Sequence, residues 1–93
     1  MRVYKSPQVR MDGKRILYSF DNDTITATFD GVTDVFNLSG IKGPINTKGI
    51  KTTLAINPIE RLDYVNGAVE VAITNYIGPD ATETERFPFY QEV

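Results

Sequence analysis

The chain has 93 residues, 41% of them hydrophobic, and contains no cysteine, histidine or tryptophan. This length predicts one domain, residues 1–93, that buries roughly 60–65% of its unfolded surface. Without Cys or His, the composition excludes disulfides, thiolate nucleophiles, His/Cys zinc sites and a Ser-His-Asp triad.

The first clear strand pattern spans Lys14–Asp21, where Ile16, Tyr18 and Phe20 share one face. After a turn cluster at residues 21–23, apolar residues and threonines alternate over Thr24–Phe29. Asp30-Gly31 then matches a two-residue type I′ hairpin. The hairpin pairs Phe29 with Val32, Ala27 with Asp34 and Ile25 with Phe36, extending the apolar face to Leu38.

Asp34 departs from this pattern because its register places it on the apolar face, opposite Ala27. We expect Asp34 to lie near a sheet edge or to pair with Lys14 or Arg15, without a catalytic role.

Residues 39–49 form the longest irregular segment, because three glycines and a proline interrupt any period. Surface loops of this kind often carry function. Alternation resumes over Ile50–Asn57 and predicts another strand. The clearest hairpin signal follows, with strands Glu60–Val65 and Ala68–Tyr76 joined by an Asn-Gly turn.

The predicted register of this second hairpin defines its two faces. Asp63 lies opposite Glu70 on the outer face, an unfavourable pair that Arg61 is placed to relieve. The buried face is predicted to comprise Leu62, Tyr64, Val69, Val71 and Ile73.

Gly78-Pro79-Asp80 ends the strand pattern and precedes the one helix candidate, which Pro88 ends after about two turns. The pairs Asp80/Glu83 and Thr82/Glu85 both have the spacing of a capping box. We expect the apolar tail to pack on the sheet. The predicted fold class is α+β, mostly antiparallel β: a compact sheet or small sandwich or barrel of five to seven strands with one short C-terminal helix.

No motif in the chain predicts catalysis, a cofactor or a metal site. The acids at residues 21–23 lack the spacing of a calcium loop. Asp63 and Glu70 resemble a carboxylate dyad, but a small hairpin offers no cleft. Residues 40–43 match the Gly-x-x-Gly loop of KH domains, yet strands flank them where that fold needs helices. We therefore predict that the protein is not an enzyme.

Charge is unevenly distributed along the chain, although the formal net charge is only −2. Residues 1–20 hold five basic side chains and one acidic one, whereas residues 58–93 hold two basic and seven acidic ones. These segments can meet within one monomer, which we favour, or between neighbouring copies. The acidic balance disfavours nucleic acid as a partner. No stretch reads as a signal peptide or a membrane span.

The chain resembles small late-region proteins of siphophages and prophages of Gram-positive, Bacillus-type bacteria in the segments Tyr4–Arg10, Asp12–Ile16, Tyr18–Phe20 and Asn75–Glu83. Ile25–Thr28, Val32–Phe36 and the end of the chain are also similar, while residues 41–51 are least so. The resemblance implies a fold like a domain of a lactococcal phage adsorption device. It also implies a role linked to the tail and host-adsorption genes, and it carries no catalytic residues.

We therefore expect a non-enzymatic, structural or accessory phage protein that acts by contact with other tail or baseplate proteins. The expected location is the host cytoplasm during infection, with incorporation into the virion left open. Two alternatives are a host-directed protein that sequesters a bacterial target and a module that binds cell-wall carbohydrate. In the second alternative, the sugars would stack on exposed Tyr4, Tyr64, Tyr76 or Tyr90. The predicted interaction surface comprises Ile41, Lys42, Pro44, Asn46, Lys48, Phe87, Phe89 and Tyr90.

Overall fold

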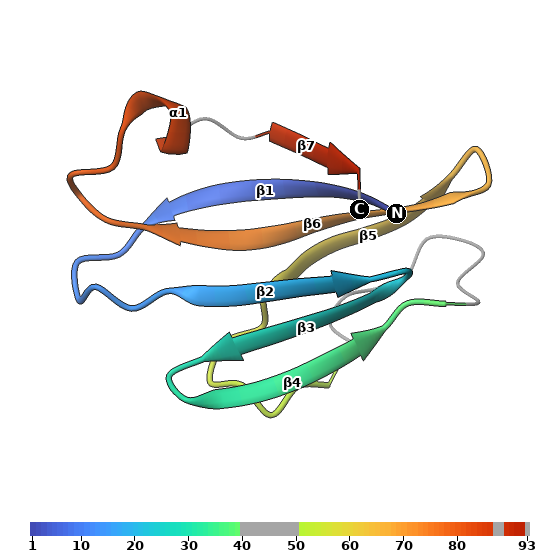
Figure 1. Cartoon of the computed structure of the whole chain (residues 1–93), viewed down its shortest axis with the longest axis horizontal. Coiled ribbons are helices and arrows are strands. Elements are labelled where there is room, and N and C mark those ends of the chain that lie inside the picture. Colours follow the sequence, from blue (N-terminus) through green and yellow to red (C-terminus); the bar gives the residue numbers. More distant parts are fainter. Residues whose placement is uncertain (40–50, 87–88, 93) are drawn as a thin grey trace.

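The computed structural model describes residues 1–39, 51–86 and 89–92, which form seven strands in two sheets and one short helix (Figure 1). Sheet A has the order β5-β6-β1-β7, and sheet B has the order β2-β3-β4. Sheet A consists of β5 (Ile59–Val65), β6 (Ala68–Ile77), β1 (Arg2–Val9) and β7 (Phe89–Glu92). Sheet B consists of β2 (Ile16–Asp21), β3 (Thr24–Phe29) and β4 (Val32–Asn37), and the helix is α1 (Glu83–Arg86). The predicted fold class is confirmed.

Strand β1, from the start of the chain, lies between two strands from its C-terminal part, β6 and β7. It pairs in parallel with β6, with Val3 opposite Val71, and antiparallel with β7, with Tyr4 opposite Tyr90. The other strand pairs of both sheets are antiparallel. As a result, the first and last described strands of the chain lie side by side, with Arg2 opposite Glu92 (Figure 1).

The hydrophobic core lies between the inner faces of the two sheets. Alternate side chains of each strand face inward, as expected for a sandwich. Tyr18 of β2 joins the layers, because its hydroxyl donates to the backbone carbonyl of Thr74 in β6 at 2.5 Å. The buried cluster comprises Val3, Ile16, Ile25, Ala27, Phe29, Phe36, Leu38, Leu54, Ile59, Leu62, Val69, Val71 and Ile73.

Both predicted hairpins form with the predicted register. Phe29 pairs with Val32 across Asp30-Gly31, and Val65 pairs with Ala68 across Asn66-Gly67. The turn residues have positive φ, 53° and 79° in the first hairpin and 49° and 80° in the second, as a type I′ turn requires. One predicted core residue differs: Tyr64 is 38% exposed because it lies near the hairpin tip.

Three further features differ from the sequence-based expectations. Strand β1 was not predicted, and the described residues 51–57 of the strand predicted over Ile50–Asn57 form no strand, with bends at residues 53–56. Helix α1 is one turn long, shorter than predicted. Thr82 and Glu85 form its capping box, with Glu85 N donating to Thr82 Oγ1 and Thr82 N donating to Glu85 Oε1, both at 3.3 Å.

Asp34 lies on the edge strand β4, as predicted, but its partners are not Lys14 or Arg15. Its Oδ2 accepts hydrogen bonds from Thr52 Oγ1 at 2.8 Å and Thr53 N at 3.0 Å, and Oδ1 accepts from Val35 N at 2.8 Å. These bonds tether residues 52 and 53 to β4 and lower the pKa of Asp34, with the Thr53 amide as the largest cause.

Replacing Asp34 by alanine is expected to reduce the free energy of unfolding by about 1 kcal/mol at pH 7. Because the folded-state pKa is lowered, this contribution is complete above the unfolded pKa of about 3.9 and is lost as pH falls through the folded value. Urea unfolding of both proteins at pH 7 and in acid measures the difference. Asp21→Ala, at an exposed position in β2, is the control and is expected to change little. A difference that persists in strong acid would contradict the role of the carboxylate.

Candidate functional site

Most of the interaction surface predicted from the sequence lies outside the described residues. This applies to Ile41, Lys42, Pro44, Asn46, Lys48 and Phe87. Phe89 is described as the first residue of β7, and Tyr90, the next residue, is 49% exposed. Tyr90 is therefore the predicted residue around which a site can be built.

Tyr90 belongs to a cluster of three side chains on the outer face of sheet A, Arg2, Tyr4 and Tyr90. Tyr4 and Tyr90 lie opposite one another on β1 and β7, with ring centroids 5.0 Å apart and ring planes tilted by 53°. The guanidinium carbon of Arg2 lies 4.3 Å from the centroid of the Tyr90 ring. These aromatic and cation–π contacts hold the cluster in place at an exposed position.

Charged side chains continue the same face across the sheet. Asp63 lies opposite Glu70, as predicted, but Arg61 relieves this repulsion only in part. The Nε of Arg61 lies 3.3 Å from Oδ2 of Asp63. Glu70 instead forms an ion pair with Arg2, whose Nη1 lies 3.4 Å from Oε1 of Glu70. Arg2 therefore lies between an acid and an aromatic ring, and the basic and acidic ends of the chain meet within the monomer.

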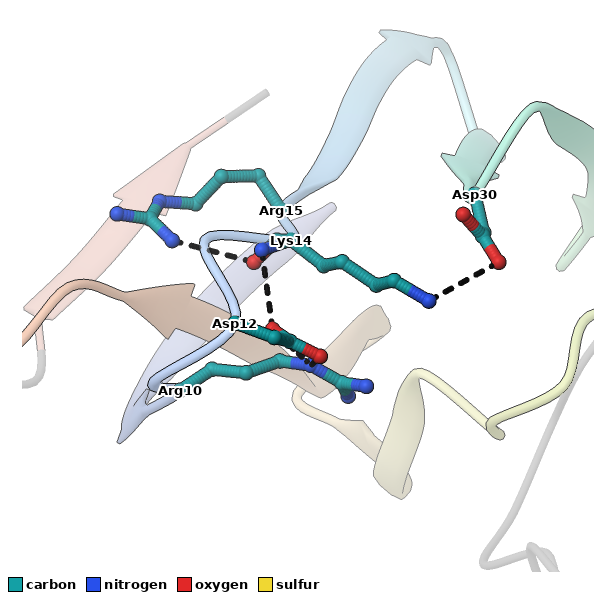
Figure 2. Close-up of polar contacts among 5 residues, drawn as sticks. All are labelled: Arg10, Asp12, Lys14, Arg15 and Asp30. Atoms are coloured by element: carbon teal, nitrogen blue, oxygen red, sulfur yellow. Dashed lines mark hydrogen bonds and ion pairs between the residues drawn. The ribbon is translucent and has the colours of Figure 1, made fainter.

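A second group of charges lies in the β1–β2 turn (Figure 2). Arg10 Nε donates to both carboxylate oxygens of Asp12, at 2.8 and 2.9 Å, and Asp12 Oδ1 also accepts the Lys14 amide at 3.1 Å. Lys14 reaches across to Asp30 at 3.2 Å, whereas the Arg15 side chain extends away from these acids. The Arg15 Nη1 donates to the Lys14 carbonyl at 3.1 Å.

The charges of this turn serve local structure first. The Arg10 guanidinium carbon lies 5.0 Å from the Phe29 ring centroid and 4.8 Å from that of Tyr76, which ties the turn to the core. The hydrogen bond from Arg10 is the largest cause that lowers the pKa of Asp12, and the bond to Asp12 in turn raises the pKa of Arg10. The turn is thus a weaker candidate for an interaction surface than the outer face of sheet A.

No protein-family model, curated protein or solved structure matches this chain.

Among the described residues, no group of three or more acids is placed to hold a metal ion. The helix in the described part of the chain is too short and polar to span a membrane. A shallow pocket of about 220 Å³ is lined by Asp34, Lys51, Thr52 and Thr53. It therefore lies where the hydrogen bonds of Asp34 hold residues 52 and 53 against β4. The chemistry available on the outer face of sheet A is that of contact: ring stacking, charge pairing and hydrogen bonding.

Sequence reasoning missed Arg2 and Tyr4 as members of the site. Tyr4 was noted among possible sugar-stacking tyrosines, but its pairing with Tyr90 depends on the antiparallel contact between the two ends of the chain. The sequence does contain a signal for this pairing of Arg2 and Tyr4. In a strand, the polar–apolar alternation of Arg2, Val3 and Tyr4 places the arginine and the tyrosine on the same face.

Proposed function

We propose that this chain is a non-enzymatic phage protein, a structural or accessory component of the tail and host-adsorption apparatus that acts by protein–protein contact. The resemblance to late-region siphophage proteins supports this class. The observation that carries the contact role is the cluster of Arg2, Tyr4 and Tyr90, in which Arg2 and Tyr90 are exposed and Tyr4 is partly buried. Tyrosine and arginine are enriched among the residues that contribute most to protein interfaces.

Quantitative mass spectrometry of gradient-purified virions, compared with the infected-cell lysate, tests the proposal. We expect a constant copy number per particle, a multiple of three or six. Presence in the lysate and absence from the particle would contradict a tail component. That result would favour the alternative of a host-directed binder.

A phage carrying Tyr90→Ala tests whether the cluster is the contact surface. We expect its affinity for the particle to fall at least about tenfold and its virion copy number to fall with it, since truncating a central aromatic residue of an interface costs about 2 kcal/mol. Tyr64→Ala is the matched control, because Tyr64 is comparably exposed but lies in β5 at the other edge of sheet A. Equal incorporation of both variants would exclude the cluster as the docking surface.

A cell-wall carbohydrate-binding module is the second candidate function. The adjacent rings of Tyr4 and Tyr90 favour it, because sugars stack on exposed aromatic side chains. Sedimentation of the purified protein with host cell walls tests this candidate. If the protein stays in the supernatant, this second function is excluded.

A further inference from the structure

The four edge strands of the two sheets differ in how they are protected. An unprotected edge presents backbone groups that pair with another strand, so proteins commonly block their edges. Strand β5 has a β-bulge between Ile59 and Arg61, and β4 is tethered at Asp34 to residues 52 and 53. Strand β2 contacts β6 of the other sheet, through the Tyr18 hydroxyl among other groups. Strand β7 has no bulge and no such tether in the described part of the chain, and its four residues present a short edge.

The direction of the backbone groups of β7 follows from the pairing of β1. Arg10 N donates to Ile77 O, so even-numbered residues of this segment direct their backbone groups toward β6. The backbone groups of odd-numbered residues therefore point toward β7. Pro7, which has no N–H to donate, is one of these odd-numbered residues and lies beyond the part of β1 that pairs with β7. Opposite residues of an antiparallel pair face each other or both face away.

The residue opposite Val3 is Gln91, so the backbone groups of Gln91 face β1. Those of Tyr90 and Glu92 consequently face outward, where no described strand pairs with them. The open edge of sheet A thus offers the N–H and C=O groups of two alternate residues. This is the pattern that an added strand uses in β-augmentation.

Charge determines which kind of strand fits this edge. In Figure 1, α1 and β7 lie along the same side of β1, away from β6, and α1 contacts β1. Residues 78–92 contain Asp80, Glu83, Glu85 and Glu92 against the single base Arg86, a net charge of −3. A second copy docking on the same edge would bring like charges together, whereas a basic strand would be attracted.

We propose that the β7 edge accepts an extended, positively charged strand of a neighbouring protein as the fifth strand of sheet A. The new strand hydrogen-bonds the backbone of Tyr90 and Glu92, and its basic side chains face the acids of the α1–β7 edge. This inference rests on the proposed function in one respect, namely that the protein acts by contact with other proteins.

Amide hydrogen exchange and chemical-shift titration by NMR test the proposal with a defined probe. The probe is a short acetylated peptide in which lysine alternates with valine and threonine, and its control has glutamate in place of lysine. We expect the lysine peptide to slow exchange of the Tyr90 and Glu92 amides and to leave the Gln91 amide, which already faces β1, unchanged. The glutamate peptide should bind at least about tenfold more weakly.

Two variants separate backbone pairing from charge. Glu92→Pro removes an outward N–H at an edge position where proline is tolerated, and it should weaken binding of the lysine peptide about tenfold. Glu92→Ala keeps the N–H and removes only the charge, so it should weaken binding less. Unchanged protection of the Gln91 amide in both variants would show that β7 still pairs with β1.

Three results would overturn the inference. These are no change at Tyr90 and Glu92 with the lysine peptide, equal binding of the glutamate peptide, and protection that rises with protein concentration alone, which would indicate a second copy. The virion measurement is independent of the peptide. If the protein is present in particles but the peptide does not bind, the proposed function stands and the β7 edge is not its docking surface.

Discussion

Replacing Ile73 by alanine is expected to lower the free energy of unfolding by about 3 kcal/mol. Ile73 is fully buried in β6, the long strand between β5 and β1, and Ile59 and Lys5 lie opposite it. Truncation removes apolar burial and leaves a cavity, which together cost about 2–5 kcal/mol for Ile→Ala in a core. Because the free energy of unfolding of such domains is about 5–15 kcal/mol, this loss is a large share of the total stability.

Urea unfolding monitored by circular dichroism measures this effect, with Val35→Ala as the matched control. Val35 also lies on a strand but is 57% exposed on the outer face of sheet B, so its truncation should change stability by less than about 0.5 kcal/mol. Equal losses in the two variants would mean that the core does not lie between the sheets as described.

The two hairpins were predictable because their signals are local. Asp30-Gly31 and Asn66-Gly67 determine both the turn type and the register, and the structure has the predicted pairs, including Asp63 opposite Glu70. The capping box at Thr82 and Glu85 is equally local. In each case the residues that make the signal are also the residues that interact.

Strand β1 was not predictable in the same way. It pairs with strands more than 60 residues away in the sequence, and its parallel pairing with β6 needs no turn between neighbours. Val3 is its one fully buried residue, while Lys5 and Pro7 interrupt an apolar alternation. After residue 50, by contrast, a strand was predicted where none forms. Leu54 and Ile56 alternate as in a strand, but they pack on the core from a segment of bends.

The candidate site was predictable only in part for the same reason. Tyr90 was expected to belong to a surface, but its partners Arg2 and Tyr4 come from the other end of the chain. The charge distribution did indicate that the two ends meet, and the Arg2–Glu70 pair brings them together within the monomer. Which backbone edge remains open depends on strand order, which no local pattern contains.

Replacing Tyr18 by phenylalanine is expected to lower stability by about 1–2 kcal/mol at pH 7 and to weaken its alkaline dependence. The variant loses the hydrogen bond from the hydroxyl to the Thr74 carbonyl, which joins the two sheets. Burial, and then the charges of Glu60 and Tyr76, raise the pKa of Tyr18 well above its ordinary value. The folded protein therefore holds this hydroxyl neutral at a pH where the unfolded chain ionises it.

A raised folded-state pKa gives stability that is complete below the unfolded pKa of about 10 and is lost as pH rises toward the folded value. The loss reaches about 1.4 kcal/mol per pH unit, so wild type should lose most of its advantage over Tyr18→Phe by about pH 11. Urea unfolding at pH 7, 10 and 11 measures this convergence. Absorbance of the tyrosinate form adds an independent control, because one tyrosine, the one absent from Tyr18→Phe, should ionise only above the unfolded pKa of about 10. If the tyrosine that is lost in Tyr18→Phe ionises near the unfolded pKa of about 10, its hydroxyl is accessible to water and cannot join the two sheets.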